Sequence, residues 1–130
     1  MNKIEKALQR TTDTKYCLLG SGVLKDSAEL FTQAFPGEKA IIVADKNTWK
    51  AAGEQVSLSL KELGIPQEQP FIFEDHHFYA EWTFVEKLTE HLRGVDAIAV
   101  AVGSGVINDL CKYVSGQLGR LYMCVGTAAS

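Results

Sequence analysis

No long hydrophobic run occurs in the 130-residue sequence. The longest unbroken apolar segment, residues 97–102, has the length of a strand, whereas a helix that crosses a bilayer needs about 20 residues. The first ten residues alternate charged and apolar side chains and contain no hydrophobic segment typical of a secretory signal peptide. We therefore predict a cytoplasmic protein that has no membrane partner.

Basic charge and paired cysteines are scarce as well. The chain has 13 Lys and Arg against 16 Asp and Glu, and its basic residues form no stripe, so a nucleic-acid partner is not expected. Cys17, Cys111 and Cys124 are odd in number and form no C-x-x-C pair, which is typical of small buried side chains in a reducing compartment. Repeats and low-complexity tracts are also absent. We predict one domain over residues 1–130.

What the sequence does contain is an alternation of strand-like and helix-like segments. Apolar segments predict strands at residues 16–19, 39–44, 71–73, 95–102 and 121–125. Helical spacing predicts helices at residues 23–35, from a cap at Asn47 or Thr48 to Gly64, from Thr83 to Gly94, and at about 106–118. Residues 95–102 are apolar at nearly every position, which indicates a strand covered on both faces. The fold class predicted is α/β, a Rossmann-like parallel sheet with helices on both faces.

Two glycine turns and one carboxylate follow predicted strands. The G-S-G turn at residues 20–22 follows the first strand, Asp45 ends the second, and the G-S-G turn at residues 103–105 follows the strand at 95–102. Ligands of parallel sheets bind beyond the carboxyl ends of the strands. Glycine lets the backbone approach a ligand, and the next helix offers unpaired amides to an anion. A diphosphate suits both properties, but the pattern alone does not decide between the two turns.

Three segments carry a resemblance to a known family. They are residues 45–56 (DKNTWKAAGEQV), residues 103–120 (GSGVINDLCKYVSGQLGR) and residues 127–130 (TAAS). Together they resemble the sn-glycerol-1-phosphate dehydrogenases, within the superfamily of glycerol dehydrogenase, dehydroquinate synthase and iron-containing alcohol dehydrogenase. The likeness extends from about Tyr16 to the end of the chain. It implies an oxidoreductase that uses NAD or NADP and a divalent metal, such as zinc, to interconvert glycerol-1-phosphate and dihydroxyacetone phosphate.

The resemblance also implies which of the two glycine turns binds the cofactor. In the family the late turn wraps the diphosphate of NAD(P), so Gly103, Ser104 and Gly105 would lie against it. Val106 and Asp109 would belong to the first helical turn beside it. The turn at residues 20–22 matches a family turn near the cofactor that does not make the main phosphate contact.

Two carboxylates, Asp45 and Asp109, lie in the segments that carry the resemblance. The resemblance implies that Asp45 accepts hydrogen bonds from the adenosine ribose, although Asp45 could instead only cap Thr48. Asp109 would repel a diphosphate, and we interpret it as orienting the loop, favoured by the helix dipole and by pairing with Lys112. Trp49 could shield the adenine, but packing on its own helix is the preferred interpretation. The preference between NAD and NADP is left open.

The end of the sequence departs from the family pattern. Thr127 and Ser130 would contact the nicotinamide half of the cofactor, but Gly126 stands where the family usually has a proline that would stiffen the turn. In the family, an Asp and two His bind the catalytic metal beyond the position of Ser130, together with a helical substrate domain. We therefore expect this chain to be the NAD(P)-binding N-terminal part of a longer enzyme and to be inactive alone.

Other interpretations stay open at this point. His76 and His77 follow two acidic residues, but no further ligands with zinc-like spacing accompany them, so a solvated loop is expected. The same fold would suit a glycerol dehydrogenase or a dehydroquinate synthase-like enzyme, which the residues after Ser130 would distinguish. A non-catalytic α/β binding module is a third alternative. Whether copies of the chain form a homo-oligomer is undecided.

Overall fold

A computed structural model describes residues 15–18, 23–73, 82–103 and 105–126. They form one five-stranded parallel sheet with the strand order β1-β5-β4-β2-β3. The strands are β1 (Lys15–Leu18), β2 (Ala40–Asp45), β3 (Phe71–Phe73), β4 (Ile98–Gly103) and β5 (Tyr122–Gly126). The predicted α/β class with a parallel sheet is confirmed.

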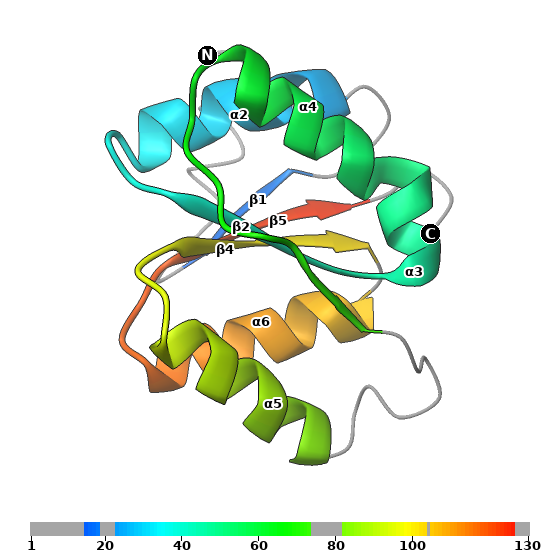
Figure 1. The fold of residues 1–130 in the computed structure, drawn as a ribbon, viewed down its shortest axis with the longest axis vertical. Helices are drawn as coiled ribbons and strands as arrows, with labels where there is room; N and C mark the ends of the chain where they lie inside the picture. The colour runs from blue at the N-terminus through cyan, green and yellow to red at the C-terminus, as the bar shows by residue number, and fades with distance from the viewer. Residues whose placement is uncertain (1–14, 19–22, 74–81, 104, 127–130) are drawn as a thin grey trace.

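Helices cover both faces of this sheet. One face carries α2 (Val23–Ala34) and α4 (Glu54–Glu62), and the other carries α5 (Trp82–Arg93) and α6 (Gly105–Gln117) (Figure 1). Between β2 and α4 the chain forms the short helix α3 (Lys46–Thr48) and a π-helical turn, η1 (Trp49–Gly53). No helix in the described residues is both long enough and apolar enough to cross a membrane.

Two apolar clusters, one on each side of the sheet, explain why β2 is apolar up to its last residue. Ala40, Ile42 and Ala44 pack in the core beneath α2 and α4. Ile41 and Val43 pack in the opposite core with α5 and α6. A strand that is buried on both sides needs no polar face, and the same alternation between the two cores holds for β4. The predicted double covering of β4 is therefore confirmed.

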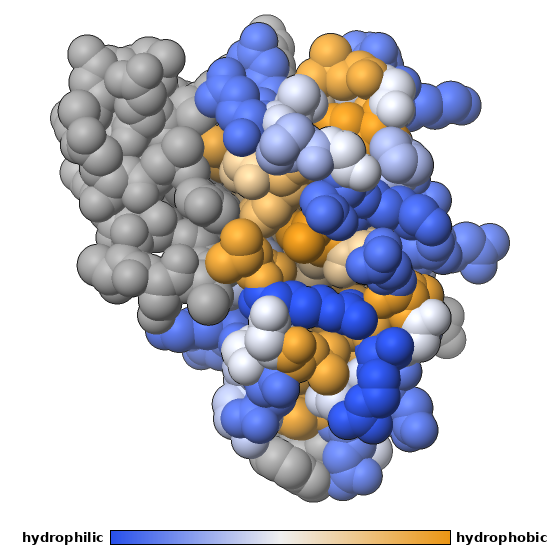
Figure 2. Space-filling view, turned by 90° about the vertical axis from the view of Figure 1, so that its left-hand side faces the viewer, coloured by the Kyte–Doolittle hydropathy of each residue, from blue (hydrophilic) through white to orange (hydrophobic). Residues whose placement is uncertain are grey.

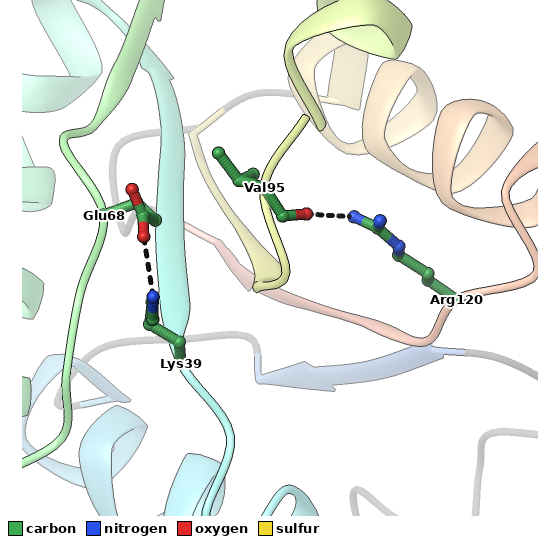
Figure 3. Close-up of polar contacts among 4 residues, drawn as sticks. All are labelled: Lys39, Glu68, Val95 and Arg120. Atoms are coloured by element: carbon green, nitrogen blue, oxygen red, sulfur yellow. Dashed lines mark hydrogen bonds and ion pairs between the residues drawn. The ribbon is translucent and has the colours of Figure 1, made fainter. Parts of the chain in front are cut away.

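The strand predicted from residue 95 begins later, at Ile98. Val95 instead belongs to the turn that ends α5, because its N–H donates to the Leu92 carbonyl at 3.2 Å. The Val95 carbonyl accepts a hydrogen bond from Arg120 Nη1 at 2.9 Å (Figure 3). The same nitrogen donates to the Leu92 carbonyl at 2.7 Å. Arg120 thus fixes the end of α5 through contacts between segments that are distant in sequence.

Two predicted helix starts are also wrong. The helix after β2 begins immediately after Asp45, which is its N-cap in place of Asn47 or Thr48. The strand runs into the helix with no loop, so one residue ends the strand and caps the helix. Trp82 already belongs to α5, so Thr83 does not cap that helix.

The amino edge of the sheet faces the viewer in Figure 2, which shows hydrophilic and hydrophobic residues side by side. Lys39 and Glu68 form an ion pair at 2.9 Å on this edge (Figure 3). The hydrogen bond from Lys39 and the charge of Glu68 raise the pKa of Lys39. Both side chains are partly exposed, so water screens the pair and it contributes little to stability.

The cysteines do not all behave as the sequence predicted. Cys111 of α6 is free and buried, and this burial raises the pKa of its thiol above the usual range. A neutral, buried thiol behaves as a small apolar side chain and is a poor nucleophile. Cys124 is disulfide-bonded, and its register partner in β1 is Cys17. The expectation of three reduced thiols is therefore wrong for Cys124.

Candidate cofactor site

The carboxyl edge of the sheet contains a topological switch point between β2 and β4, which are neighbours. From β2 the chain passes to β3 over the face that carries α4. From β4 it passes to β5 in the opposite direction, over the face that carries α6. Two helices therefore begin on opposite sides of adjacent strand ends, at the right of Figure 1. In open α/β sheets this arrangement creates the crevice in which ligands bind.

Most of the predicted site residues that the structure describes lie at this switch point. Asp45 is the last residue of β2, and Gly103 is the last residue of β4. Gly105 begins α6, whose first turns include Val106 and Asp109. The structure thus brings the carboxylate and the late glycine turn to one edge of the sheet. The predicted residues outside the described part of the chain are Gly20, Ser21, Gly22, His76, His77, Ser104, Thr127 and Ser130.

Asp45 is held in place by a capping box with Thr48. The Asp45 Oδ1 accepts a hydrogen bond from the Thr48 N–H at 2.7 Å, and the Thr48 Oγ1 accepts one from the Asp45 N–H at 3.0 Å. Only 7% of Asp45 is exposed, so its carboxylate is both buried and fixed. The predicted cap of Thr48 is confirmed. The Asp45 carboxylate can still accept hydrogen bonds from a ligand, because a carboxylate has about four acceptor positions and the cap uses one of them.

Gly103 adopts a backbone conformation that only glycine readily adopts, with φ at 139°. A Cβ atom at this position would lie 2.6 Å from the Thr48 Cγ2 atom. The bare backbone is therefore required by the fold itself. It also provides the close approach that a diphosphate needs at the start of a helix, so the turn fits the dinucleotide that the sequence predicted.

The predicted pairing of Asp109 with Lys112 is not formed. Both side chains are exposed, and no ion pair joins them in the described part of the chain. A different contact supports the start of α6, because the Tyr122 hydroxyl donates to the Asn108 Oδ1 at 2.9 Å. Tyr122 is fully buried, so this bond attaches the first turn of α6 to β5. In the sequence, Asn108 stands where the dinucleotide-binding pattern G-x-G-x-x-G has its last glycine.

The π-helical turn η1 lies directly after α3 and supports the Asp45 region. Trp49 is partly buried and packs against the core beneath α2 and α4. Its ring also covers Gly53, where a Cβ would lie 2.6 Å from the Trp49 Cε3 atom. Packing of Trp49 on its own helix is therefore confirmed. The glycine makes room for the ring in a turn type that occurs often at functional sites.

Gly53→Ala is expected to lower the free energy of unfolding by about 1–2 kcal/mol, because overpacking against Trp49 outweighs the gain in helix propensity. Urea unfolding followed by circular dichroism measures the change. In the double variant with Trp49→Leu, the alanine should be less destabilising than in the wild-type background, since the clash is with the ring. An alanine variant as stable as the wild type would contradict this account of the turn.

The described residues do not gather metal ligands, since no three His, Cys, Asp or Glu side chains among them could hold an ion together. A surface hollow of about 340 Å³ lies between α5 and α6. Its lining includes Glu86, Arg93 and Leu118 but none of the strand ends. We therefore place the candidate site at the switch point and not in this hollow.

Comparison with known proteins agrees with this geometry. The sequence profile of the iron-containing alcohol dehydrogenases matches residues 18–130. The chain belongs to the iron-containing alcohol dehydrogenase family. This confirms the superfamily that the motifs around Asp45 and Gly103 suggested.

The sequence identity between this chain and individual members of the iron-containing alcohol dehydrogenase family is low. The chain is 26% identical over 114 residues to a glycerol-1-phosphate dehydrogenase (NAD(P)+) of Haloarcula marismortui, covering 87% of this chain and 31% of that protein. It is 32% identical over 93 residues to the enzyme of the same name from Bacillus velezensis, covering 69% and 23%. The crystal structure of glycerol dehydrogenase from Schizosaccharomyces pombe aligns with a TM-score of 0.66 at 17% identity, covering 88% and 28%. The chain thus spans less than a third of each of these relatives.

Proposed function

We propose that this chain is the NAD(P)-binding part of a longer glycerol-1-phosphate dehydrogenase. The observation that carries the proposal is the placement of Asp45 and Gly103 at the ends of adjacent strands, on either side of the topological switch point. The two curated relatives are named for this activity and for NAD(P)+, which supports both the reaction and the cofactor. The glycerol dehydrogenase alternative receives weaker support, since at 17% identity that likeness concerns the fold alone.

Each end of the site would hold a different part of the dinucleotide. The backbone of Gly103, Ser104 and Gly105 and the free amides of the first turn of α6 would bind the diphosphate, helped by the helix dipole. Asp45 would accept hydrogen bonds from the adenosine ribose hydroxyls. The remaining proposed contacts are Val106 and Asp109 beside the diphosphate, and Thr127 and Ser130 at the nicotinamide half.

The chemistry of the parent enzyme needs more than this chain provides. When bound, NAD(P) would supply or accept the hydride that interconverts glycerol-1-phosphate and dihydroxyacetone phosphate. The family name implies a metal, but the described residues offer no cluster of ligands that could hold one. We propose that the metal ligands and the substrate-binding residues belong to the rest of the parent protein. This chain alone would then bind cofactor without catalysing turnover.

Asp45→Asn tests the proposed ribose contact. Asparagine caps a helix as well as aspartate, so the fold should persist while the charged acceptor is lost. The Kd for NADH, measured by the enhancement of NADH fluorescence, is expected to rise about tenfold. NADPH should lose less affinity than NADH, because the substitution also removes the repulsion between Asp45 and a 2′-phosphate.

The control for this substitution is Asp96→Asn, which neutralises an exposed carboxylate just before β4, at the opposite edge of the sheet, and should change the Kd for NADH by less than about twofold. A wild-type chain that does not bind NADH, or an Asp45→Asn variant that binds it equally well, would contradict the proposed site. Substantial turnover of dihydroxyacetone phosphate by this chain alone would overturn the proposal that the rest of the enzyme is needed.

A further inference from the structure

We propose that Thr48 is a positioning residue of the cofactor site, whose side chain sets the spacing between Asp45 and the glycine turn at Gly103. The inference rests on the proposed cofactor function and extends it to a residue that was not among the predicted site residues. Three observations support it: two contacts of the Thr48 side chain and the end of the pairing between β2 and β4.

The first is the attachment of Thr48 to the end of β2. Its Oγ1 accepts a hydrogen bond from the Asp45 N–H at 3.0 Å, and its own N–H donates to the Asp45 Oδ1 at 2.7 Å. The hydroxyl therefore fixes the backbone of Asp45, while the amide fixes its carboxylate. A shift of Thr48 would move the proposed ribose acceptor with it.

The second is the contact of Thr48 with the end of β4. The positions of Thr48 Cγ2 and Cβ are 2.6 and 2.9 Å from the point where a Cβ of Gly103 would lie. The methyl group of Thr48 thus occupies the space that a side chain at residue 103 would take. It rests against the backbone that begins the proposed diphosphate turn.

The third observation is that the backbone pairing between β2 and β4 ends before the last residues of the two strands. The register between them ends at Val43 opposite Ala101. Continued by two residues, the same register would place Asp45 opposite Gly103, which is where the Thr48 side chain lies. The separation of the two strand ends therefore depends on this side chain and not on ladder hydrogen bonds.

A dinucleotide is sensitive to this separation because its adenosine ribose and its diphosphate are joined through a single carbon. A ligand that spans Asp45 and the glycine turn binds well only when both partners are correctly spaced. Adenosine reaches Asp45 but carries no phosphate, so its affinity should not depend on the spacing. The ratio of ADP affinity to adenosine affinity therefore reports the role of Thr48.

Two variants test the methyl group and the hydroxyl of Thr48 separately. Thr48→Ser keeps the hydroxyl and removes the methyl group against Gly103, so the Kd for ADP should rise about tenfold while that for adenosine changes less than about twofold. Thr48→Val keeps the branched shape and loses the acceptor for the Asp45 N–H. It should weaken both ligands by a similar factor and leave the ratio unchanged. Isothermal titration calorimetry on the full chain, with adenosine and ADP as probes, measures both constants.

Amide hydrogen exchange without ligand provides a second measurement. Thr48→Ser should increase exchange at Gly103 several-fold and leave Ile98, at the other end of β4, unchanged. If the wild type binds ADP while neither the affinity ratio nor the exchange at Gly103 changes in the serine variant, the positioning role is wrong and the proposed function stands. If the wild type binds neither ligand, the proposed function is wrong. In that case, the exchange rate of the Gly103 amide is the remaining test of whether Thr48 sets the distance between the ends of β2 and β4.

Discussion

Gly103→Ala is expected to raise the Kd for NADH by at least about a hundredfold and to lower the free energy of unfolding by about 3 kcal/mol. Two penalties add at this residue. Its φ of 139° is strained for any side chain, and the new Cβ would lie 2.6 Å from Thr48 Cγ2. Thr48 cannot move aside freely because its capping box holds it to Asp45. The strand end must shift instead, and with it the proposed diphosphate turn.

Alanine substitutions at two other glycines distinguish the cost of the positive φ from the cost of the steric clash. Gly119 has a positive φ of 69° but open space around it, so Gly119→Ala should cost about 1 kcal/mol. Gly116 lies in α6 with no positive φ and nothing within 4 Å, so Gly116→Ala should stabilise the chain by up to about 1 kcal/mol. Neither control should change NADH binding. Urea unfolding and NADH titration of the three variants measure both effects, and wild-type affinity in Gly103→Ala would contradict the proposed site.

Much of the fold could be predicted because its core strands are buried on both faces. Such strands are apolar at successive positions, and they alternate with segments whose apolar residues recur at helical spacing. Parallel strands place their carboxyl ends on one edge, which predicts that Asp45 and the late glycine turn share that edge. Their direct adjacency was not predictable, because the strand order β1-β5-β4-β2-β3 does not follow the order along the chain.

The details of the site depended on contacts that a local pattern does not encode. The helical spacing predicted Asn47 or Thr48 as the cap, and a cap of Thr48 by Asp45 was only the alternative to ribose binding, whereas Asp45 both ends the strand and caps the helix. The importance of Thr48 arises from its contact with Gly103, which only tertiary packing creates. The π-helical turn η1 was also missed, since one wider turn leaves the apolar spacing of the following helix intact.

Arg120→Met is expected to lower the free energy of unfolding by about 2–3 kcal/mol, because two hydrogen bonds from a charged donor are lost. Arg120 Nη1 donates to the Leu92 carbonyl at 2.7 Å and to the Val95 carbonyl at 2.9 Å. The Leu92 carbonyl keeps a second donor, the Val95 N–H at 3.2 Å. The Val95 carbonyl therefore suffers the greater loss. Urea unfolding followed by circular dichroism measures the change.

Arg93→Met provides the matched control, since Arg93 is exposed on the last turn of α5 and its loss should cost less than about 1 kcal/mol. Arg120→Lys should recover only part of the stability, because a single ammonium lacks the planar fork of the guanidinium. Arg120 and its two carbonyl partners lie on the amino edge, opposite the proposed cofactor site, so Arg120→Met should keep the wild-type Kd for NADH when measured well below its unfolding transition. Equal stability of the Arg120→Met and Arg93→Met variants would show that packing, and not the Arg120 side chain, fixes the end of α5.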